Sequence, residues 1–124
     1  MADCFADSYG LVALLAGERR YTRIFQHEDV VTSAMNVLEV YATLLRKLPT
    51  SEARDIATGL LGSVVDVPTE VAFGAAEFRQ EMRARRRDCS YIDAWGYAAA
   101  RHFSIPFLTG DSAFEGIDGV RFLR

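Results

Sequence analysis

The stretch that decides the fold is Cys89–Gly116, CSYIDAWGYAAARHFSIPFLTGDSAFEG. It predicts a helix, then a short buried strand over Ile105–Leu108, then a Thr-Gly-Asp turn. Asp93 then lies near the start of the helix, and Asp111 lies just past the end of the strand. In an open α/β sheet, ligands bind outside the carboxyl ends of the strands. Both aspartates are therefore candidates for a functional site at that edge.

The rest of the chain alternates short apolar runs with helical patterns. Helices are expected between Ser8 and Gly17 and over residues 19–26, 33–48, 50–61 and 69–86. The other apolar runs, which we predict as strands, are Cys4–Ala6, Val30–Val31, Val64–Val67 and Gly119–Leu123. Strands that alternate with helices indicate a mostly parallel α/β sheet covered on both faces.

Length and composition favour one globular domain spanning residues 1–124. Half of the 124 residues are hydrophobic, which is enough for one buried core. The two cysteines have no metal-ligand spacing, which favours a reduced compartment. The N-terminus lacks a secretory signal, and the apolar run Ser8–Gly17 is too short to span a bilayer. We therefore expect a soluble, cytoplasmic protein without a membrane partner. The net charge of −3 argues against a large basic field but does not exclude nucleic acid.

Two further acids occupy similar places, and each acid has an ordinary structural explanation. Asp7 follows the first strand, where it can cap a helix. Asp93 completes the capping-box pattern Ser90-x-x-Asp93, and Asp111 lies in a common turn sequence. Glu39 lies opposite the apolar stripe of its own helix, so periodicity predicts a solvated side chain. This stripe comprises Val37, Leu38, Tyr41, Leu44, Leu45 and Leu48.

Taken together, the four acids predict a metal site. Carboxylates that converge repel one another unless a cation balances them. Oxygen ligands without cysteine or histidine select Mg²⁺ or Mn²⁺ over zinc. Such a metal can hold a phosphate oxygen and activate a water molecule for in-line attack.

Four segments of the chain carry a family resemblance. They are Asp7-Ser8, Asn36-Val-Leu-Glu39-Val40, Ser90-Tyr-Ile-Asp93-Ala and Leu108-Thr-Gly-Asp111-Ser112-Ala-Phe114. In this order they resemble the PIN-domain ribonucleases, and most closely the toxin halves of VapBC-type toxin–antitoxin pairs. The resemblance covers nearly the whole chain, and its last third is the most specific part.

The resemblance implies a three-layer α/β/α sandwich that cleaves RNA with Mg²⁺ or Mn²⁺. A homodimer and a cognate antitoxin as partners are also implied. The positions that match the family's catalytic and metal-binding acids are Asp7, Glu39, Asp93 and Asp111, and the supporting polar positions are Ser8, Asn36 and Thr109. The expected reaction is attack of a metal-activated water on a phosphodiester, and the residues leave open which carboxylate orients that water.

Two residues depart from the family pattern. Tyr9 stands where a small polar residue usually follows the Asp-Ser pair. Asp3 adds an acid inside the first strand, so either Asp3 or Asp7 could face the metal. We choose Asp7 because it adjoins Ser8.

A basic segment ends the helix that precedes Asp88. Cations at a helix C-terminus complement the helix dipole, which explains the segment without any ligand. The functional interpretation is a phosphate-binding patch, which predicts a salt-sensitive affinity for RNA. The candidate RNA-binding residues are Arg83, Arg85 and Arg86.

Three other functions compete with this interpretation. A phosphoacceptor signalling domain needs a lysine after a late strand, and no lysine follows Lys47. A PIN-like module that only binds RNA or protein is disfavoured because all four acids are present. A housekeeping RNA-processing nuclease of the same fold stays open beside the toxin.

Overall fold

The computed structural model describes residues 2–124, and its centre is a small parallel sheet. Among these residues the strands are β1 (Cys4–Ala6), β2 (Val30–Val31), β3 (Phe107–Thr109) and β4 (Val120–Phe122). They lie in the order β2-β1-β3-β4, and every neighbouring pair is parallel. Because all four strands run the same way, their carboxyl ends meet at one edge of the sheet.

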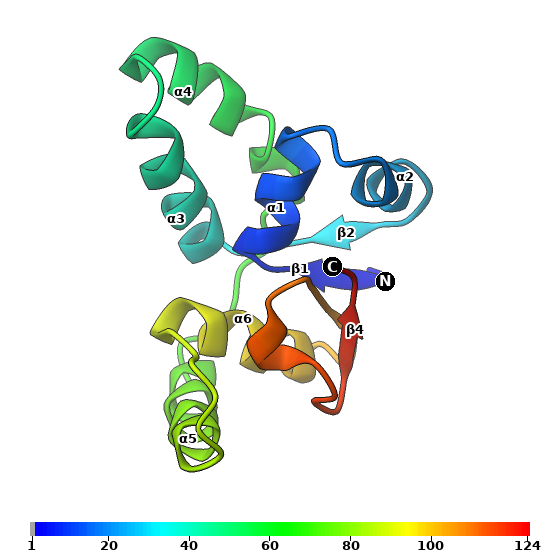
Figure 1. Ribbon diagram of the computed structural model, residues 1–124, viewed down its shortest axis with the longest axis vertical. Helices are drawn as coiled ribbons and strands as arrows, with labels where there is room; N and C mark the ends of the chain where they lie inside the picture. The colour runs from blue at the N-terminus through cyan, green and yellow to red at the C-terminus, as the bar shows by residue number, and fades with distance from the viewer. Residues whose placement is uncertain (1) are drawn as a thin grey trace.

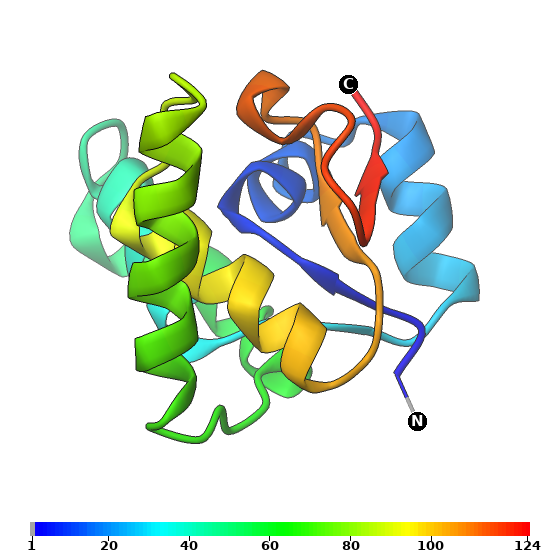
Figure 2. The same ribbon diagram turned by 90° about the horizontal axis from the view of Figure 1, so that it is seen from below.

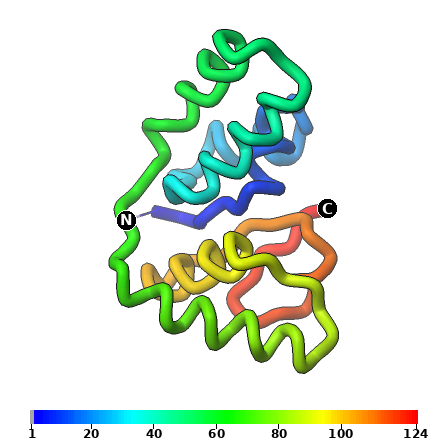
Figure 3. Tube along the Cα trace, turned by 90° about the vertical axis from the view of Figure 1, so that its left-hand side faces the viewer, coloured from blue at the N-terminus to red at the C-terminus, as the bar shows by residue number. Residues whose placement is uncertain are grey.

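Helices cover both faces of this sheet (Figures 1 and 3). Helices α1 (Ser8–Leu15), α2 (Arg19–His27), α3 (Ala34–Leu45) and α4 (Thr50–Thr58) lie on one side. Helices α5 (Val71–Ala84) and α6 (Tyr91–His102) pack against each other on the opposite side (Figure 2). Two 3₁₀ turns, η1 (Leu61–Ser63) and η2 (Ser112–Phe114), complete the described elements. The three-layer α/β/α sandwich is therefore confirmed.

Side chains of β1 alternate between two hydrophobic cores. Cys4 and Ala6 pack in the core on the side of α1 and α2, and Phe5 packs in the core on the side of α5 and α6. Phe107 and Leu108 of β3 divide in the same way. A sheet buried on both faces needs such continuously apolar strands, which is why the short runs in the sequence predict them well.

The predicted strand Val64–Val67 is wrong. Only Val64 pairs, through an isolated parallel bridge with Thr32, and the amide of Val65 donates to the Thr32 carbonyl at 2.9 Å. Ser33, which follows Thr32 in the sequence, already caps α3. The extended chain that follows β2 therefore stops at Thr32, and the residues after Val65 find no strand within residues 2–124 to pair with.

The strand predicted over Ile105–Leu108 begins two residues later, at Phe107. Pro106 has no amide hydrogen and cannot donate to a strand ladder. Its carbonyl still accepts from the amide of Phe5 at 2.9 Å, so the chain is already extended at that point.

The predicted apolar stripe of α3 is also wrong in part. Leu38 is 57% exposed and Leu45 is exposed, whereas Asn36 and Val40 are buried. Apolar residues occur on more than one face of this helix, so periodicity alone does not select the face that meets α1. Glu39 is half-buried beside Val40 instead of fully solvated.

Candidate functional site

Asp7 occupies the carboxyl end of β1 and caps α1. Its side chain is 2% exposed, and its Oδ1 accepts from the amide of Gly10 at 2.8 Å. Its Oδ2 accepts from the hydroxyl of Thr109, which follows Leu108 at the end of β3. The Thr109 hydroxyl oxygen accepts in turn from the amide of Asp111 at 3.0 Å. Asp7 is thus both a helix cap and the buried acid of this edge, and Thr109 joins it to Asp111.

The environment of Asp7 disfavours its charged form. Burial raises the pKa of Asp7 to about 7, against the lowering effect of the hydrogen bonds from Thr109 and Gly10. The charges of Asp93 and Asp111 raise it further. Acids from three separate segments therefore lie near enough to one another at this edge for their charges to repel.

Asp93 is held at the start of α6 by a capping box. The amide of Ser90 donates to Asp93 Oδ2 at 3.1 Å, and the amide of Asp93 donates to Ser90 Oγ at 3.0 Å. Burial raises the pKa of Asp93, the bonds from Ser90 lower it, and the charges of Asp111 and Glu39 raise it. The predicted capping box is therefore confirmed. The charges of the other acids also act on the carboxylate that forms it.

Asp111 and Glu39 complete the group of acids. Asp111 caps η2, because its Oδ1 accepts from the amide of Ala113 at 3.0 Å. Glu39, on α3, acts on Asp93 through its charge. It lines a groove with Ser8 and Tyr9, which is separate from the hollow that Asp93 and Asp111 line.

The supporting polar residues form a buried network. Ser33 donates from Oγ to Asn36 Oδ1 at 2.6 Å, and Asn36 Nδ2 donates to Ser8 Oγ at 3.4 Å. Trp95 Nε1 donates to Ser33 Oγ at 3.2 Å, which ties α6 to α3. Sequence reasoning found Asn36, Ser8 and the cap at Ser33 but missed Trp95, because nothing in its spacing distinguishes an indole that donates from one that only packs.

Asp3 lies away from this group. Its carboxylate accepts from the amide of Asp29 at 2.7 Å, next to the start of β1 and β2. That position is at the amino edge of the sheet, so Asp7 is the acid of the first strand that lies with Asp93 and Asp111.

The donor set fits Mg²⁺ or Mn²⁺ better than zinc. It consists of carboxylate, hydroxyl and amide oxygens, which are hard ligands. Within residues 2–124, however, no group of three or more His, Cys, Asp or Glu side chains is already arranged to hold a metal. Asp7, Asp93 and Asp111 each accept a hydrogen bond from a nearby backbone amide, as capping carboxylates do. A divalent cation would offset the burial and repulsion that raise the pKa of Asp7 and Asp93.

A hollow of about 550 Å³ adjoins Asp93 and Asp111, and its wall also includes Arg86 and Arg87. Of the predicted RNA-binding residues, the structure brings Arg86 to this hollow. Arg83 and Arg85 are exposed at the end of α5 and do not line it. Cationic and anionic side chains thus face the same space.

Arg87 braces the turn that carries Asp111. Its Nη1 donates to the carbonyls of Ala113 at 2.8 Å and Glu115 at 2.7 Å. The run of arginines gave no reason to separate this residue from its neighbours. Its role depends on contacts 26 and 28 residues away in the sequence.

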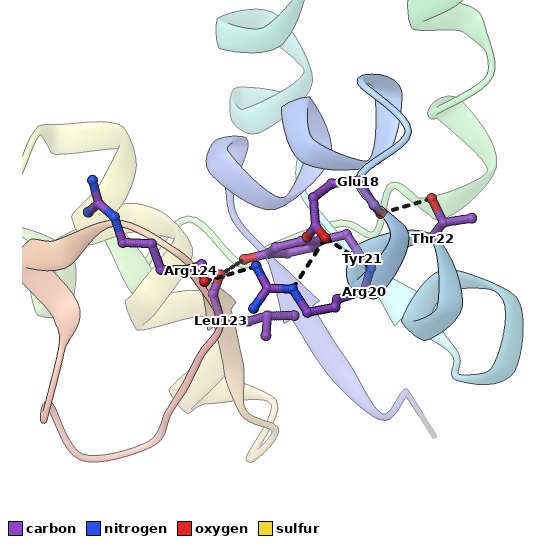
Figure 4. A network of polar contacts seen from close by, with 6 residues as sticks. All are labelled: Glu18, Arg20, Tyr21, Thr22, Leu123 and Arg124. Carbon is purple, nitrogen blue, oxygen red and sulfur yellow. Dashed lines mark hydrogen bonds and ion pairs between the residues drawn. The ribbon is translucent and has the colours of Figure 1, made fainter.

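Tyr9 packs directly against Gly110, in the turn between Thr109 and Asp111. A Cβ at Gly110 would collide with the Tyr9 ring and with the Leu123 carbonyl oxygen. That carbonyl also accepts from Tyr21 Oη at 2.6 Å, in the network of Figure 4. Tyr9, which departs from the family pattern, therefore leaves no room for a side chain at position 110, in the turn between Thr109 and Asp111.

Replacing Gly110 with alanine is expected to lower the free energy of unfolding by about 1–3 kcal/mol, because ring and backbone must both move. Gly62→Ala is the matched control, because a Cβ at Gly62 would meet no neighbouring atom within 4 Å. Urea denaturation of both variants measures the difference. Equal midpoints would show that the Tyr9 ring moves aside without cost.

Comparison with known proteins identifies the family. The model of the PIN domain matches residues 5–120, so this chain belongs to the PIN-domain family. The resemblance drawn from the four sequence segments is therefore confirmed. No curated protein sequence matches the chain. Within residues 2–124 no helix combines the length and apolar character that crossing a membrane requires.

Solved structures of toxin–antitoxin proteins share this fold. VapC20 of Mycobacterium tuberculosis, described as a sarcin-ricin loop cleaving toxin, is 26% identical with a TM-score of 0.72, over 96% of this chain and 99% of that chain. DNA-bound VapBC from Salmonella typhimurium is 16% identical with a TM-score of 0.79, over 99% and 98%. A toxin–antitoxin complex from Klebsiella pneumoniae is 19% identical with a TM-score of 0.73, over 96% of each chain.

Proposed function

We propose that this protein is a metal-dependent endoribonuclease and the toxin of a toxin–antitoxin pair. The observation that carries the proposal is the buried Asp7 at the carboxyl edge of the sheet, whose pKa is raised by burial and by Asp93 and Asp111. Acids with strongly shifted pKa values beside an open hollow are typical of functional sites. The PIN-domain family and the RNA-cleaving VapC20 support ribonuclease activity in particular.

The residues that would hold Mg²⁺ or Mn²⁺ are Asp7, Glu39, Asp93 and Asp111. Such an ion supplies positive charge that stabilises the attacking and leaving oxygens of phosphodiester hydrolysis. Thr109 fixes the orientation of the Asp7 carboxyl through its hydroxyl. Asn36 Nδ2 donates to the hydroxyl of Ser8, the residue that follows Asp7. These contacts keep the acids close to one geometry before any substrate binds, which reduces the cost of assembling the site.

The test is cleavage of labelled single-stranded and structured RNAs by the purified protein with Mg²⁺, Mn²⁺ or EDTA. We expect cleavage with either cation and none in EDTA, with activity restored when excess Mg²⁺ or Mn²⁺ is added back. A folded protein that cuts none of these RNAs in either cation would contradict the proposal, and so would cleavage that EDTA leaves unchanged.

Arg86 is expected to contact RNA phosphate, because it lines the same hollow as Asp93 and Asp111. Its backbone has φ 58°, a conformation that asparagine tolerates, so Arg86→Asn removes the charge with little strain. We expect this variant to bind single-stranded RNA more weakly and to lower the slope of log affinity against log salt by about 0.7. Arg23→Gln, at an exposed position of α2, is the control that leaves the slope unchanged.

We also propose an antitoxin and a second copy of the chain as partners. Toxin–antitoxin complexes among the similar structures support the antitoxin. Large apolar side chains exposed on α1, α3 and α4 support a protein partner on that side of the sheet, and they include Val12, Leu15, Leu38, Leu45 and Ile56. Light scattering of the isolated protein tests the homodimer, with a mass near 13.8 kDa contradicting it.

A further inference from the structure

Tyr91 presents an aromatic ring to solvent from the first turn of α6, the turn that also carries Asp93. It is the first residue of α6 and is 69% exposed. The guanidinium of Arg79 lies over its ring, with the carbon Cζ 4.0 Å from the ring centroid. Arg79 is itself fixed, because its Nε donates to the Cys89 carbonyl at 2.9 Å. A cation thus holds one face of the ring in a defined place.

The position of this ring relates it to the site. Tyr91 itself does not line the hollow of Asp111 and Arg86, but it lies between two residues that do. It directly follows Ser90 and comes two residues before Asp93. A phosphodiester bound at these acids would leave an adjoining nucleotide close to the first turn of α6.

We propose that the Tyr91 ring is a stacking platform for a base of single-stranded RNA next to the cleaved phosphodiester. The inference rests on the proposed ribonuclease function and deepens it by naming a base-binding residue. Recognition of single-stranded RNA combines cationic groups for phosphate with aromatic rings for unstacked bases, and Arg86, Arg79 and Tyr91 supply both. A protein partner would favour a broad apolar surface here, whereas the adjoining hollow carries charges of both signs.

A matched control exists on the neighbouring helix. Phe73 is 75% exposed but lies near the start of α5, whereas Arg79 lies further along the same helix, toward the arginines of the hollow. Phe73→Ala therefore shows whether removing any exposed aromatic ring, and not Tyr91 in particular, weakens RNA binding.

The experiment measures binding of labelled single-stranded RNA 12-mers by fluorescence anisotropy, with EDTA present so that no RNA is cut. One 12-mer is intact and the others each carry a single abasic nucleotide at successive positions. The proteins are wild type, Tyr91→Ala, Tyr91→Phe and Phe73→Ala, each checked for folding by circular dichroism. Cleavage of the intact 12-mer in Mg²⁺ is measured in parallel.

We expect Tyr91→Ala to bind the intact 12-mer about tenfold more weakly, and Tyr91→Phe and Phe73→Ala to bind as wild type does. One abasic position should weaken binding by wild type and make no difference to Tyr91→Ala. A purely structural role of Tyr91 would not produce this dependence on one base.

Equal binding of the intact RNA by wild type and Tyr91→Ala would overturn the inference. It would also be overturned if the abasic nucleotide weakened binding by Tyr91→Ala as much as it weakens binding by wild type. If wild type still cleaves RNA in Mg²⁺ in that case, the proposed function stands. Coupling between Tyr91 and one base, without cleavage by wild type, would support base stacking on Tyr91 but contradict the nuclease and the place of that base beside a cleaved phosphodiester. Absence of RNA binding by wild type would overturn the inference outright.

Discussion

Asp93→Asn is expected to reduce RNA cleavage by about a hundredfold or more while the protein stays folded. The substitution removes one of the charges that would hold the metal, and loss of transition-state charge stabilisation costs rates of this order. Asparagine keeps an oxygen that can accept from the Ser90 amide, so the cap of α6 is preserved. It also removes repulsion with Asp111 and Glu39, which favours the folded state.

Cleavage rates in Mg²⁺ and thermal unfolding together check this expectation. Asp55→Asn, at an exposed position of α4, is the control that should cleave as wild type does. An Asp93→Asn protein that cuts RNA at the wild-type rate would remove Asp93 from the site.

The second large effect concerns pH and the stability of the metal-free protein. The folded state raises the pKa of Asp7 from 3.8 to about 7, so it binds a proton more tightly than the unfolded chain does. The free energy of unfolding should therefore fall as pH rises between about 4 and 7. A shift of this size corresponds to at most about 4 kcal/mol. The raised pKa of Asp93 acts in the same direction.

Asp7→Asn should remove most of this pH dependence and make the metal-free protein more stable than wild type at pH 8. Asparagine can still accept from the amide of Gly10 and needs no counter-ion. Urea denaturation in EDTA at pH 5, 6, 7 and 8 measures the effect, with Asp3→Asn as the control at the amino edge. A wild-type protein that becomes more stable toward pH 8 in EDTA would contradict the assigned environment of Asp7.

Adding Mg²⁺ at pH 8 should restore stability to wild type and not to Asp7→Asn, because the cation favours the ionised carboxyl. Such a result would mean that stability is given up at Asp7 for a charge that binds the cation, as is common at active sites.

The order of elements and the acids of the sheet edge could be predicted from the sequence because local patterns determine them. Continuous apolar runs identify β1 and β2 where both faces are buried, and Ser90-x-x-Asp93 specifies its own cap. Asp7 need not be either a helix cap or a site residue, because its Oδ1 caps α1 while its Oδ2 accepts from the Thr109 hydroxyl. A carboxylate has enough acceptor capacity for both roles.

Features that depend on distant partners could not be predicted. The buried face of α3 is set by its packing against α1, α4 and α6, so Leu38 is exposed while Asn36 is buried. Val64 pairs with Thr32, but Thr32 is the last residue before the cap of α3, so no pairing partner in the described chain is left for the residues after Val65. Arg87 and Trp95 act through hydrogen bonds to segments far away in the sequence. Local spacing carries no information about such contacts.

Binding of a divalent cation by the carboxylates is the most direct requirement of the proposed function. Titration calorimetry of Mn²⁺ into the folded protein near pH 7, in buffers of different ionisation enthalpy, measures both affinity and proton release. We expect wild type to bind Mn²⁺ and release protons, because Asp7 is partly protonated at that pH, and Asp93→Asn to bind much more weakly. Absence of binding by folded wild type, or equal binding by Asp93→Asn, would contradict the account.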